Sequence, residues 1–360
     1  MEILKVDLGE RSYDIVFGTG VISRLGSLCR GLALGKDVMV ITNSVIGKYY
    51  FDAVRKSLVE SGYTVHKFVM PDGEVYKNAE TLQLIYDALI GAGLDRGAFV
   101  LALGGGVVGD IAGYAAASYL RGISFVQVPT TLLAQVDSSV GGKTGINHAK
   151  GKNLIGAFYQ PKLVCIDLET LDTLPEREYI SGLAEVVKYG VIADADFFDF
   201  IYSNSAKLLA RDKDCLLTVE KRSCAIKASV VMQDERESGL RAVLNFGHTI
   251  GHAIESLSEY KCYLHGEAVA IGMAHAAMIS EAMGYSTKAD TNRIVNLLES
   301  LQLPVKLPAY STEAYSGAIL RDKKVKDGYI TFVLNNGIGN HSLVKISDLN
   351  AVLKKCGIGE

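Results

Sequence analysis

Residues 1–174 alternate short β-type runs with helical stretches, and this alternation restricts the fold more than any other feature of the chain. It predicts a parallel sheet covered by helices. The first two runs, 3–8 and 13–17, are expected to form a hairpin. Further strands are expected over 38–42, 64–70, 99–103, 125–128 and 163–166, with helices over 51–61 and 79–91 between them.

The character of the sequence changes after Pro175. Amphipathic helices are expected over 180–192, 197–209, 216–233, 248–257, 267–283 and 291–301, followed by a hairpin over 329–334 and 341–346. A chain of 360 residues exceeds the roughly 250–300 residues at which one hydrophobic core usually stops growing. We therefore expect two domains, an α/β domain over 1–174 and a mainly α-helical domain over 175–360.

Composition excludes several classes of protein. The net charge of −3 and the isoelectric point near 6.2 leave no basic surplus, so we expect no nucleic acid as partner. The first ten residues lack the apolar core of a secretory signal, and no run of about 18 apolar residues occurs. We expect a cytoplasmic protein without a membrane span. Six scattered cysteines without a Cys-x-x-Cys pair favour reduced thiols.

A glycine-rich turn follows the apolar run 99–103. Gly104, Gly106 and Gly109 satisfy the pattern G-x-G-x-x-G between an expected strand and an expected helix, where backbone N–H groups can receive a phosphate. The acid usually found about 20 residues later is missing, and the motif lies far from the first βα turn, which argues against an ordinary Rossmann dehydrogenase. The glycines alone fit a tight turn in a packed sheet equally well.

Polar residues at the ends of other expected strands favour ligand binding over a purely structural turn. Since the carboxyl ends of parallel strands form the ligand-binding edge of an open sheet, their convergence with Gly105 predicts a Rossmann-like dinucleotide site. The threonines among them would look the same if they only capped a helix. The residues are Asn43, Asp72, Glu74, Lys77, Asp110, Thr130 and Thr131.

Three distant segments of the second half offer metal ligands. Glu185, His248 and His265 provide one carboxylate and two imidazoles, and His252 stands one helical turn after His248. This set suits a catalytic divalent metal with an open position. Alternatives remain: Glu185 and Lys188 fit a surface ion pair, and His265 a helix cap. Thr249 replaces the base of an H-E-x-x-H motif, which disfavours a metalloprotease.

A polar, glycine-rich connection joins the expected strands 125–128 and 163–166. It contains Asp137, Lys143, Lys152 and Asn153, and it fits either a flexible surface loop or a segment that folds over an anionic ligand. Further donors are Arg121, Lys227, Arg241 and Asn245. By themselves, Lys227 and Arg241 would be interpreted as solvated helix charges.

Taken together, these motifs resemble the 3-dehydroquinate synthase family, a member of the sugar-phosphate cyclase superfamily. The resemblance runs in the family's order from about residue 40 to residues 321–324. It rests on segments 72–74, 104–110, 128–147, 183–188, 245–248 and 265–267.

The resemblance implies an NAD-binding N-terminal domain, a C-terminal domain that holds zinc or cobalt, and a homodimer. Glu185, His248 and His265 would be the metal ligands, and His252 would support a ligand or face the substrate. The implied catalytic residues are Asp137, Lys143, Lys188, Lys227, Arg241, Asn245 and His252. The implied substrate-binding residues are Arg121, which would reach the neighbouring subunit, and Lys152, Asn153 and Lys324.

The implied activity belongs to the shikimate pathway of aromatic amino acid biosynthesis. This phosphate-eliminating lyase converts 3-deoxy-D-arabino-heptulosonate 7-phosphate to 3-dehydroquinate and phosphate, by transient oxidation with NAD, elimination, re-reduction, ring opening and an internal aldol step. The substrate carries a carboxylate and a phosphate, which would account for a cationic pocket in a slightly acidic chain.

Three other functions fit parts of the pattern. A deoxy-inosose or valiolone synthase would act on a substrate without the carboxylate, whereas Arg241 with Asn245 and His252 favours a carboxylate ligand. A metal-dependent polyol dehydrogenase would not require so many lysines. A nucleotide-sensing binding protein would leave the metal ligands without a role.

Overall fold

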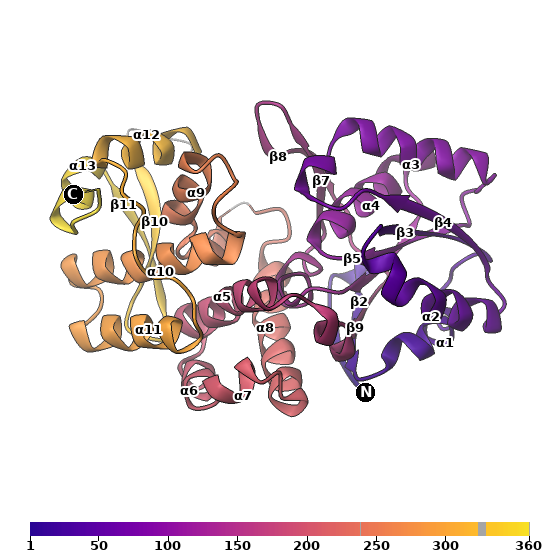
Figure 1. The fold of residues 1–360 in the computed structure, drawn as a ribbon, viewed down its shortest axis with the longest axis horizontal. Coiled ribbons are helices and arrows are strands. Elements are labelled where there is room, and N and C mark those ends of the chain that lie inside the picture. The colour runs from indigo at the N-terminus through magenta and orange to yellow at the C-terminus, as the bar shows by residue number, and fades with distance from the viewer. Residues whose placement is uncertain (238, 323–328, 360) are drawn as a thin grey trace. The chain divides into compact units, whose positions relative to one another are not determined.

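The computed structural model describes residues 1–237, 239–322 and 329–359. The chain divides into two compact units, Met1–Leu174 and Pro175–Glu360. The first unit is built on a mainly parallel sheet and the second is mainly helical, so the predicted fold classes of the two halves are confirmed (Figure 1).

The first unit contains a seven-stranded sheet in the order β1-β2-β9-β6-β5-β3-β4. β1 and β2 pair in antiparallel fashion, as expected for the opening hairpin, and the other neighbours pair in parallel. The strands are β1 (Glu2–Val6), β2 (Tyr13–Gly18), β3 (Asp37–Asn43), β4 (Thr64–Met70), β5 (Phe99–Gly104), β6 (Ser124–Pro129) and β9 (Leu163–Asp167).

Helices cover both faces of this sheet. In β3, Val38 and Val40 belong to the apolar cluster under α1 and α2, whereas Met39 and Ile41 belong to the cluster under α3 and α4. This alternation follows from the two-residue period of a strand. The helices are α1 (Leu25–Arg30), α2 (Ile46–Glu60), α3 (Ala79–Gly91) and α4 (Gly106–Ser118). Short 3-10 or π-helical segments lie at η1 (Gly9–Arg11), η2 (Val21–Arg24), η3 (Glu74–Tyr76), η4 (Tyr119–Arg121), η5 (Ala134–Ser138) and η6 (Leu168–Thr173).

The polar connection before β9 is not a loop. It forms an antiparallel hairpin of β7 (Lys143–His148) and β8 (Gly151–Phe158), so the flexible-loop alternative is wrong. The hairpin forms because Ile146 joins the apolar cluster under α3 and α4, and because Thr144 lies against Gly113 of α4. The strands were not predicted because the many glycines and lysines of this segment interrupt the alternation of apolar and polar residues.

The second unit consists of helices and one hairpin. Its elements are α5 (Glu176–Ala193), α6 (Ala195–Ser203), α7 (Ser205–Leu209), α8 (Lys213–Gln233), η7 (Leu240–Asn245), α9 (His248–Leu257), α10 (His265–Ala282), α11 (Lys288–Ser300), α12 (Thr312–Asp322), β10 (Ile330–Asn335), β11 (His341–Ile346) and α13 (Leu349–Lys355). The expected late hairpin is confirmed, since β10 and β11 pair in antiparallel fashion.

The core of the second unit gathers around α9 and α10. Ile250, Ile254 and Ile271 pack there with Phe332 of β10 and Tyr315 of α12. The single helix expected over 197–209 is wrong, because the helix is interrupted at Asn204. There the Phe200 carbonyl accepts both the backbone N–H and the side-chain amide of Asn204.

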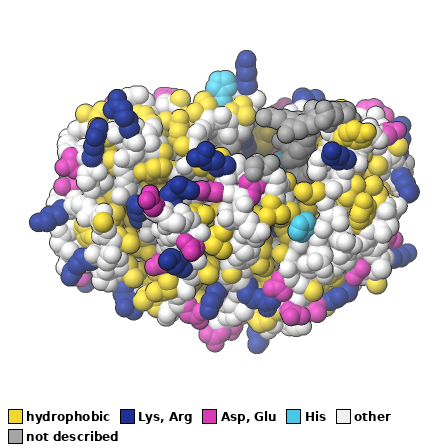
Figure 2. Space-filling model, turned by 180° about the vertical axis from the view of Figure 1, so that it is seen from behind, with side chains coloured by type: hydrophobic (Ala, Val, Ile, Leu, Met, Phe, Trp, Pro, Cys, Tyr) yellow, Lys and Arg dark blue, Asp and Glu magenta, His cyan; other side chains and the backbone are white. Residues whose placement is uncertain are grey.

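None of the helices in the described ranges is long and apolar enough to cross a membrane. Figure 2 shows Lys and Arg side chains dispersed over the face that it presents, with acidic side chains between them. On this face the basic side chains do not gather into one patch.

Candidate functional site

Glu185, His248 and His265 meet in the second unit. One ligand atom from each lies within 4.8 Å of the others. The His248 Nε2 is 3.4 Å, and the His265 Nε2 3.7 Å, from the same oxygen, Glu185 Oε1. Glu185 is fully buried in the middle of α5, and the two histidines begin α9 and α10. This geometry brings together the three ligands that the resemblance implies.

Close helix packing makes this meeting possible. Gly247 adopts a left-handed φ of 79°, and a Cβ there would lie 2.8 Å from the carbonyl of Val269 in α10. A Cβ at Gly266 would lie only 1.8 Å from the carbonyl of Ser181 in α5. Glycine is therefore required where α10 approaches its two neighbours.

Hydrogen bonds orient both imidazoles. His248 Nδ1 lies 3.1 Å from the Phe246 carbonyl, an acceptor, so this nitrogen carries the proton and Nε2 is left as the ligand atom. His265 Nδ1 lies 3.5 Å from Glu255 Oε2, which leaves its Nε2 directed at Glu185. A carbonyl or carboxylate behind each histidine is the usual support of a metal ligand.

The charges of the centre are strongly perturbed. Burial lowers the pKa of His248 well below its ordinary value, although the Glu185 charge opposes this shift. Burial also lowers the pKa of His265, but hydrogen bonds and charges from Glu185 and Glu255 outweigh it and raise the pKa to about 10. Without a cation, a protonated His265 therefore balances part of the carboxylate charge.

Lys188 forms an ion pair with Glu185, and both side chains are buried. The alternative of a surface ion pair is thus wrong. The interpretation of Lys227 and Arg241 as solvated charges is also wrong, because 6% and 2% of these residues are exposed. The Arg241 guanidinium donates to the Glu235 carbonyl over 2.8 Å.

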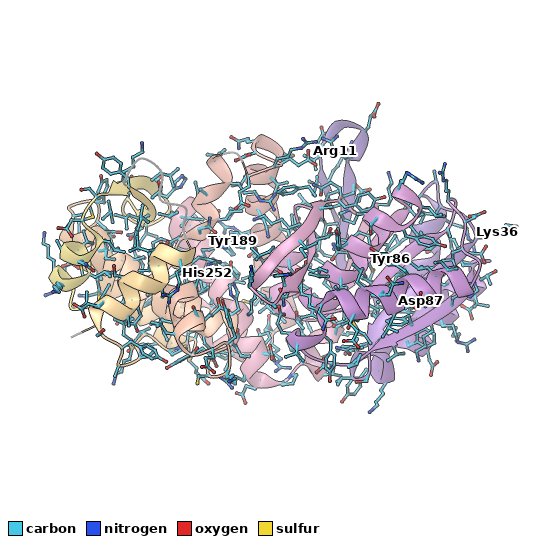
Figure 3. All side chains as sticks on the ribbon, turned by 90° about the horizontal axis from the view of Figure 1, so that it is seen from above. Arg11, Lys36, Tyr86, Asp87, Tyr189 and His252 are labelled. Carbon is cyan, nitrogen blue, oxygen red and sulfur yellow. The ribbon has the colours of Figure 1, made fainter. Side chains whose placement is uncertain are left out.

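His252 and Glu255 extend this cluster along α9. The His252 ring, labelled in Figure 3, lies 5.4 Å from the His248 ring and 6.2 Å from the His265 ring between centroids. His252, Glu255 and His265 form a second trio with ligand atoms within 4.8 Å of one another. Sequence reasoning missed Glu255, although its position three residues after His252 places it on the same helix face.

Close contacts surround the glycine-rich turn of the first unit. Gly104 ends β5, and α4 begins at Gly106. A Cβ at Gly105 would lie 3.0 Å from the Thr131 side chain, and one at Gly106 would lie 3.0 Å from Ser138 Oγ. The turn is therefore tightly packed, as expected if the glycines serve only the packing of the sheet. It also presents the first N–H groups of α4 at the carboxyl edge of the sheet, as a phosphate site requires.

Polar residues singled out from the sequence meet at this edge. Asn43 Nδ2 donates to Asp72 Oδ1 over 2.6 Å. The Lys77 ammonium lies 2.5 Å from Asp110 Oδ2 and 2.6 Å from Asn153 Oδ1. Five residues from four separate segments thus form two hydrogen-bonded groups.

The two threonines differ. Thr131 Oγ1 accepts the N–H of Ala134, so Thr131 has the capping role left open above. The Thr130 hydroxyl is buried and has no hydrogen-bonding partner among the described residues. A buried unpartnered hydroxyl at a strand end is available to a ligand.

The remaining candidates are dispersed over several elements. Arg121 is exposed with a left-handed φ of 69°, Lys143 begins β7, and Asp137 lies in η5. Asn245 ends η7, three residues before His248. Lys324 lies outside the described residues.

Comparisons of the sequence with known proteins identify its family. The sequence matches the family models described as 3-dehydroquinate synthase N-terminal, over residues 67–181, and 3-dehydroquinate synthase C-terminal, over residues 182–325. The chain is 64% identical to 3-dehydroquinate synthase of Geotalea uraniireducens, over 100% of both chains.

Two solved structures share the fold. One is 2-epi-5-epi-valiolone synthase of Streptomyces hygroscopicus with NAD+ and Zn2+ bound, with a TM-score of 0.88, 30% identity and 98% of each chain covered. The other is 2-deoxy-scyllo-inosose synthase complexed with carbaglucose-6-phosphate, NAD+ and Co2+, with a TM-score of 0.89, 26% identity and 99% and 100% of the chains covered. Since the family models match residues 67–325 and the Geotalea relative aligns from end to end, the chain belongs to the 3-dehydroquinate synthase family.

Proposed function

We propose that this chain is a 3-dehydroquinate synthase, which converts 3-deoxy-D-arabino-heptulosonate 7-phosphate to 3-dehydroquinate and phosphate. The convergence of Glu185, His248 and His265 is the observation that carries this proposal. Family membership supports it, as does the 64% identity to a 3-dehydroquinate synthase over the full length of both chains.

The donor set fits a divalent cation. One carboxylate oxygen and two imidazole nitrogens suit zinc or cobalt and leave a position for substrate oxygens. The Phe246 carbonyl behind His248 and the Glu255 carboxylate behind His265 direct the Nε2 atoms of the two rings toward Glu185. We propose these three residues as ligands, with His252 next to them as a group that faces the substrate or supports a ligand.

The first unit supplies the elements expected of an NAD site. Asn43, Asp72, Glu74 and Lys77 would hold the nucleotide with Asp110. Gly104, Gly105, Gly106 and Gly109 would admit its phosphates, next to Thr130 and Thr131. When bound, NAD would supply a reversible hydride acceptor and the metal a Lewis acid for the alcohol that is oxidised.

The chain's own residues would bind and orient the substrate. Lysine ammonium groups at Lys143, Lys152 and Lys188 supply point charges for phosphate or carboxylate. Buried Arg241 supplies a planar fork suited to a carboxylate, and Asn245 a neutral donor. Asp137, Lys227, Asn153, Arg121 and Lys324 complete the proposed set. Such fixed charges favour phosphate departure because they are positioned before the reaction starts.

The cyclase reaction is redox-neutral overall, since the hydride removed from the substrate returns to it. The test is to incubate the protein with substoichiometric NAD, a divalent metal and the heptulosonate phosphate. Phosphate release should match carbocycle formation without accumulation of NADH. Accumulation of stoichiometric NADH would instead indicate a polyol dehydrogenase. Turnover of a hexose phosphate without a carboxylate in its place would indicate another cyclase.

We further propose a cytoplasmic homodimer that acts in the shikimate pathway. The exposed Arg121 in its left-handed turn would contribute to the neighbouring subunit. Sedimentation analysis of wild type and Arg121→Ala tests this point. Both should sediment as dimers, while the variant binds substrate more weakly. A monomeric wild type would contradict the proposal.

A further inference from the structure

The β7–β8 hairpin carries Lys152 and Asn153, and its strand pairing is irregular where they lie. Ile146 pairs with Ile155, but the next pair is His148 with Gly151. Asn147 therefore stands opposite three residues of β8, 152–154. Such a bulge redirects side chains and is frequent beside functional sites.

The Asn147 side chain closes this bulge. Its Oδ1 accepts the N–H of Asn153 over 2.9 Å, and Asn153 adopts a left-handed φ of 55°. Its Nδ2 donates to Glu74 Oε1 over 2.7 Å, and its backbone N–H donates to the Lys77 carbonyl over 2.8 Å. A single residue thus bonds to the bulge and to both ends of the segment Glu74–Lys77.

Lys77 joins the two segments a second time. Only 4% of this residue is exposed, and its ammonium contacts both Asp110 at the start of α4 and Asn153 Oδ1 in the hairpin. We call Glu74, Lys77, Asp110, Asn147 and Asn153 the Asn147 network. The network joins residues assigned above to the nucleotide with a residue assigned to the substrate.

Apolar packing does not hold the outer part of the hairpin. Thr144 and Ile146 are buried at its base, whereas 63% of Leu154 is exposed. A two-stranded hairpin is marginally stable without such packing. The bonds of the Asn147 network therefore contribute to the position of Lys152.

We propose that Asn147 is a positioning residue that couples nucleotide binding to anion binding, an inference that rests on the proposed function. The network holds the bulge against the Glu74–Lys77 segment. A ligand on either side favours this held arrangement, so each ligand strengthens binding of the other. Asn147 itself contacts neither ligand in this proposal.

The test measures NAD affinity of the full chain by calorimetry, with and without saturating inorganic phosphate as the anion probe. Wild type should bind NAD about 5-fold more tightly with phosphate present, a typical coupling. In Asn147→Ala this ratio should fall close to one, while NAD still binds. Asn147→Asp keeps the acceptor for Asn153 but faces the Glu74 carboxylate with a like charge, so it should also lose the coupling.

His148→Ala is the matched control. His148 is the exposed neighbour of Asn147, and its ring accepts the Lys150 N–H. This variant should keep the wild-type ratio. Thermal unfolding checks that all variants fold; if Asn147→Ala does not, Asn147→Asp carries the test.

An unchanged ratio in both Asn147 variants, or a ratio of one in wild type, would overturn the inference while leaving the synthase assay positive. A wild type that binds no NAD and forms no carbocycle would instead contradict the proposed function, and the inference with it. Trypsin cleavage after Lys150 and Lys152 gives a second measurement. NAD should slow it in wild type, and should slow it much less in Asn147→Ala.

Discussion

The metal centre and the Asn147 network both hold charged side chains close together, but different elements hold them. Glu185, His248 and His265 project from three helices whose backbones touch. The network joins the segment Glu74–Lys77 and Asp110 of α4 to a hairpin through side-chain hydrogen bonds. Helix packing gives a geometry that resists change, whereas a hydrogen-bonded hairpin can open and close. If the proposed roles are correct, the metal ligands are fixed before the cation binds, and the β7–β8 hairpin responds to its ligands.

The largest expected effect tests the proposed metal ligands, which the packed helices hold in place. Glu185→Gln should weaken metal binding by more than about 100-fold, because it removes the charged ligand between two imidazoles. Competition with a chelator measures this loss. NAD binding by the first unit should persist. Glu178→Gln, a substitution at an exposed position of the same helix, is the control. Normal metal content in Glu185→Gln would show that Glu185 is not a ligand.

The second prediction concerns the β7–β8 hairpin, where we expect a large effect on turnover. Lys143→Ala at the start of β7 should reduce kcat about 100-fold or more, as expected for loss of a group that stabilises developing charge. Circular dichroism should show an intact fold. Lys36→Ala, a substitution in the same unit at a lysine to which no role is assigned, is the control. Full activity of Lys143→Ala would show that β7 has only a structural role.

The origin of the fixed geometry can be tested at Gly266. An alanine Cβ there would lie 1.8 Å from the Ser181 carbonyl, so Gly266→Ala should destabilise the fold by ~2–3 kcal/mol and weaken metal binding. Gly317→Ala in α12 meets only the end of the Arg321 side chain at 3.6 Å. This control should be neutral or slightly stabilising, and urea unfolding compares the two. Equal stability would show that the helix contact is not tight.

The last test compares wild type with Glu255→Gln over a range of pH in the metal-free protein. Because the pKa of His265 is raised from 6.5 to about 10, its protonated form stabilises the fold. This contribution is complete below pH 6.5 and is lost as the pH rises to about 10. Glu255→Gln removes one of the two carboxylates that raise the pKa, so the loss should occur at lower pH. Urea midpoints between pH 6.5 and 10 measure the shift, and coincident curves for wild type and variant would contradict it.

Much of the architecture could be predicted from local pattern. Strand and helix periods identified the two fold classes, and the glycine-rich turn after β5 was placed correctly between a strand and a helix. The four-residue spacing of His248 and His252 predicted a shared helix face, and their rings are adjacent. These features depend on residues close together in the chain.

Other features depended on distant residues and were missed. The β7–β8 hairpin was not predicted because its packing partner, α4, lies elsewhere in the sequence. Lys227 and Arg241 have the local pattern of exposed charges and are nevertheless buried. The spacing of Glu255 from His252 indicates only a shared helix face, and Asn147 has no comparable spacing; their contacts with His265 and with Glu74 appear only in the folded chain.

The sequence by itself determined the periodicity of the elements, the donor types available to a metal and an anion, and the family motifs. Tertiary structure decided which donors meet, which nitrogen of each histidine faces Glu185, and that a polar connection becomes a hairpin held at Asn147. The reason is physical. Periodicity and side-chain chemistry are local properties, whereas burial, hydrogen-bond partners and the closest approach of two helices exist only after distant segments pack.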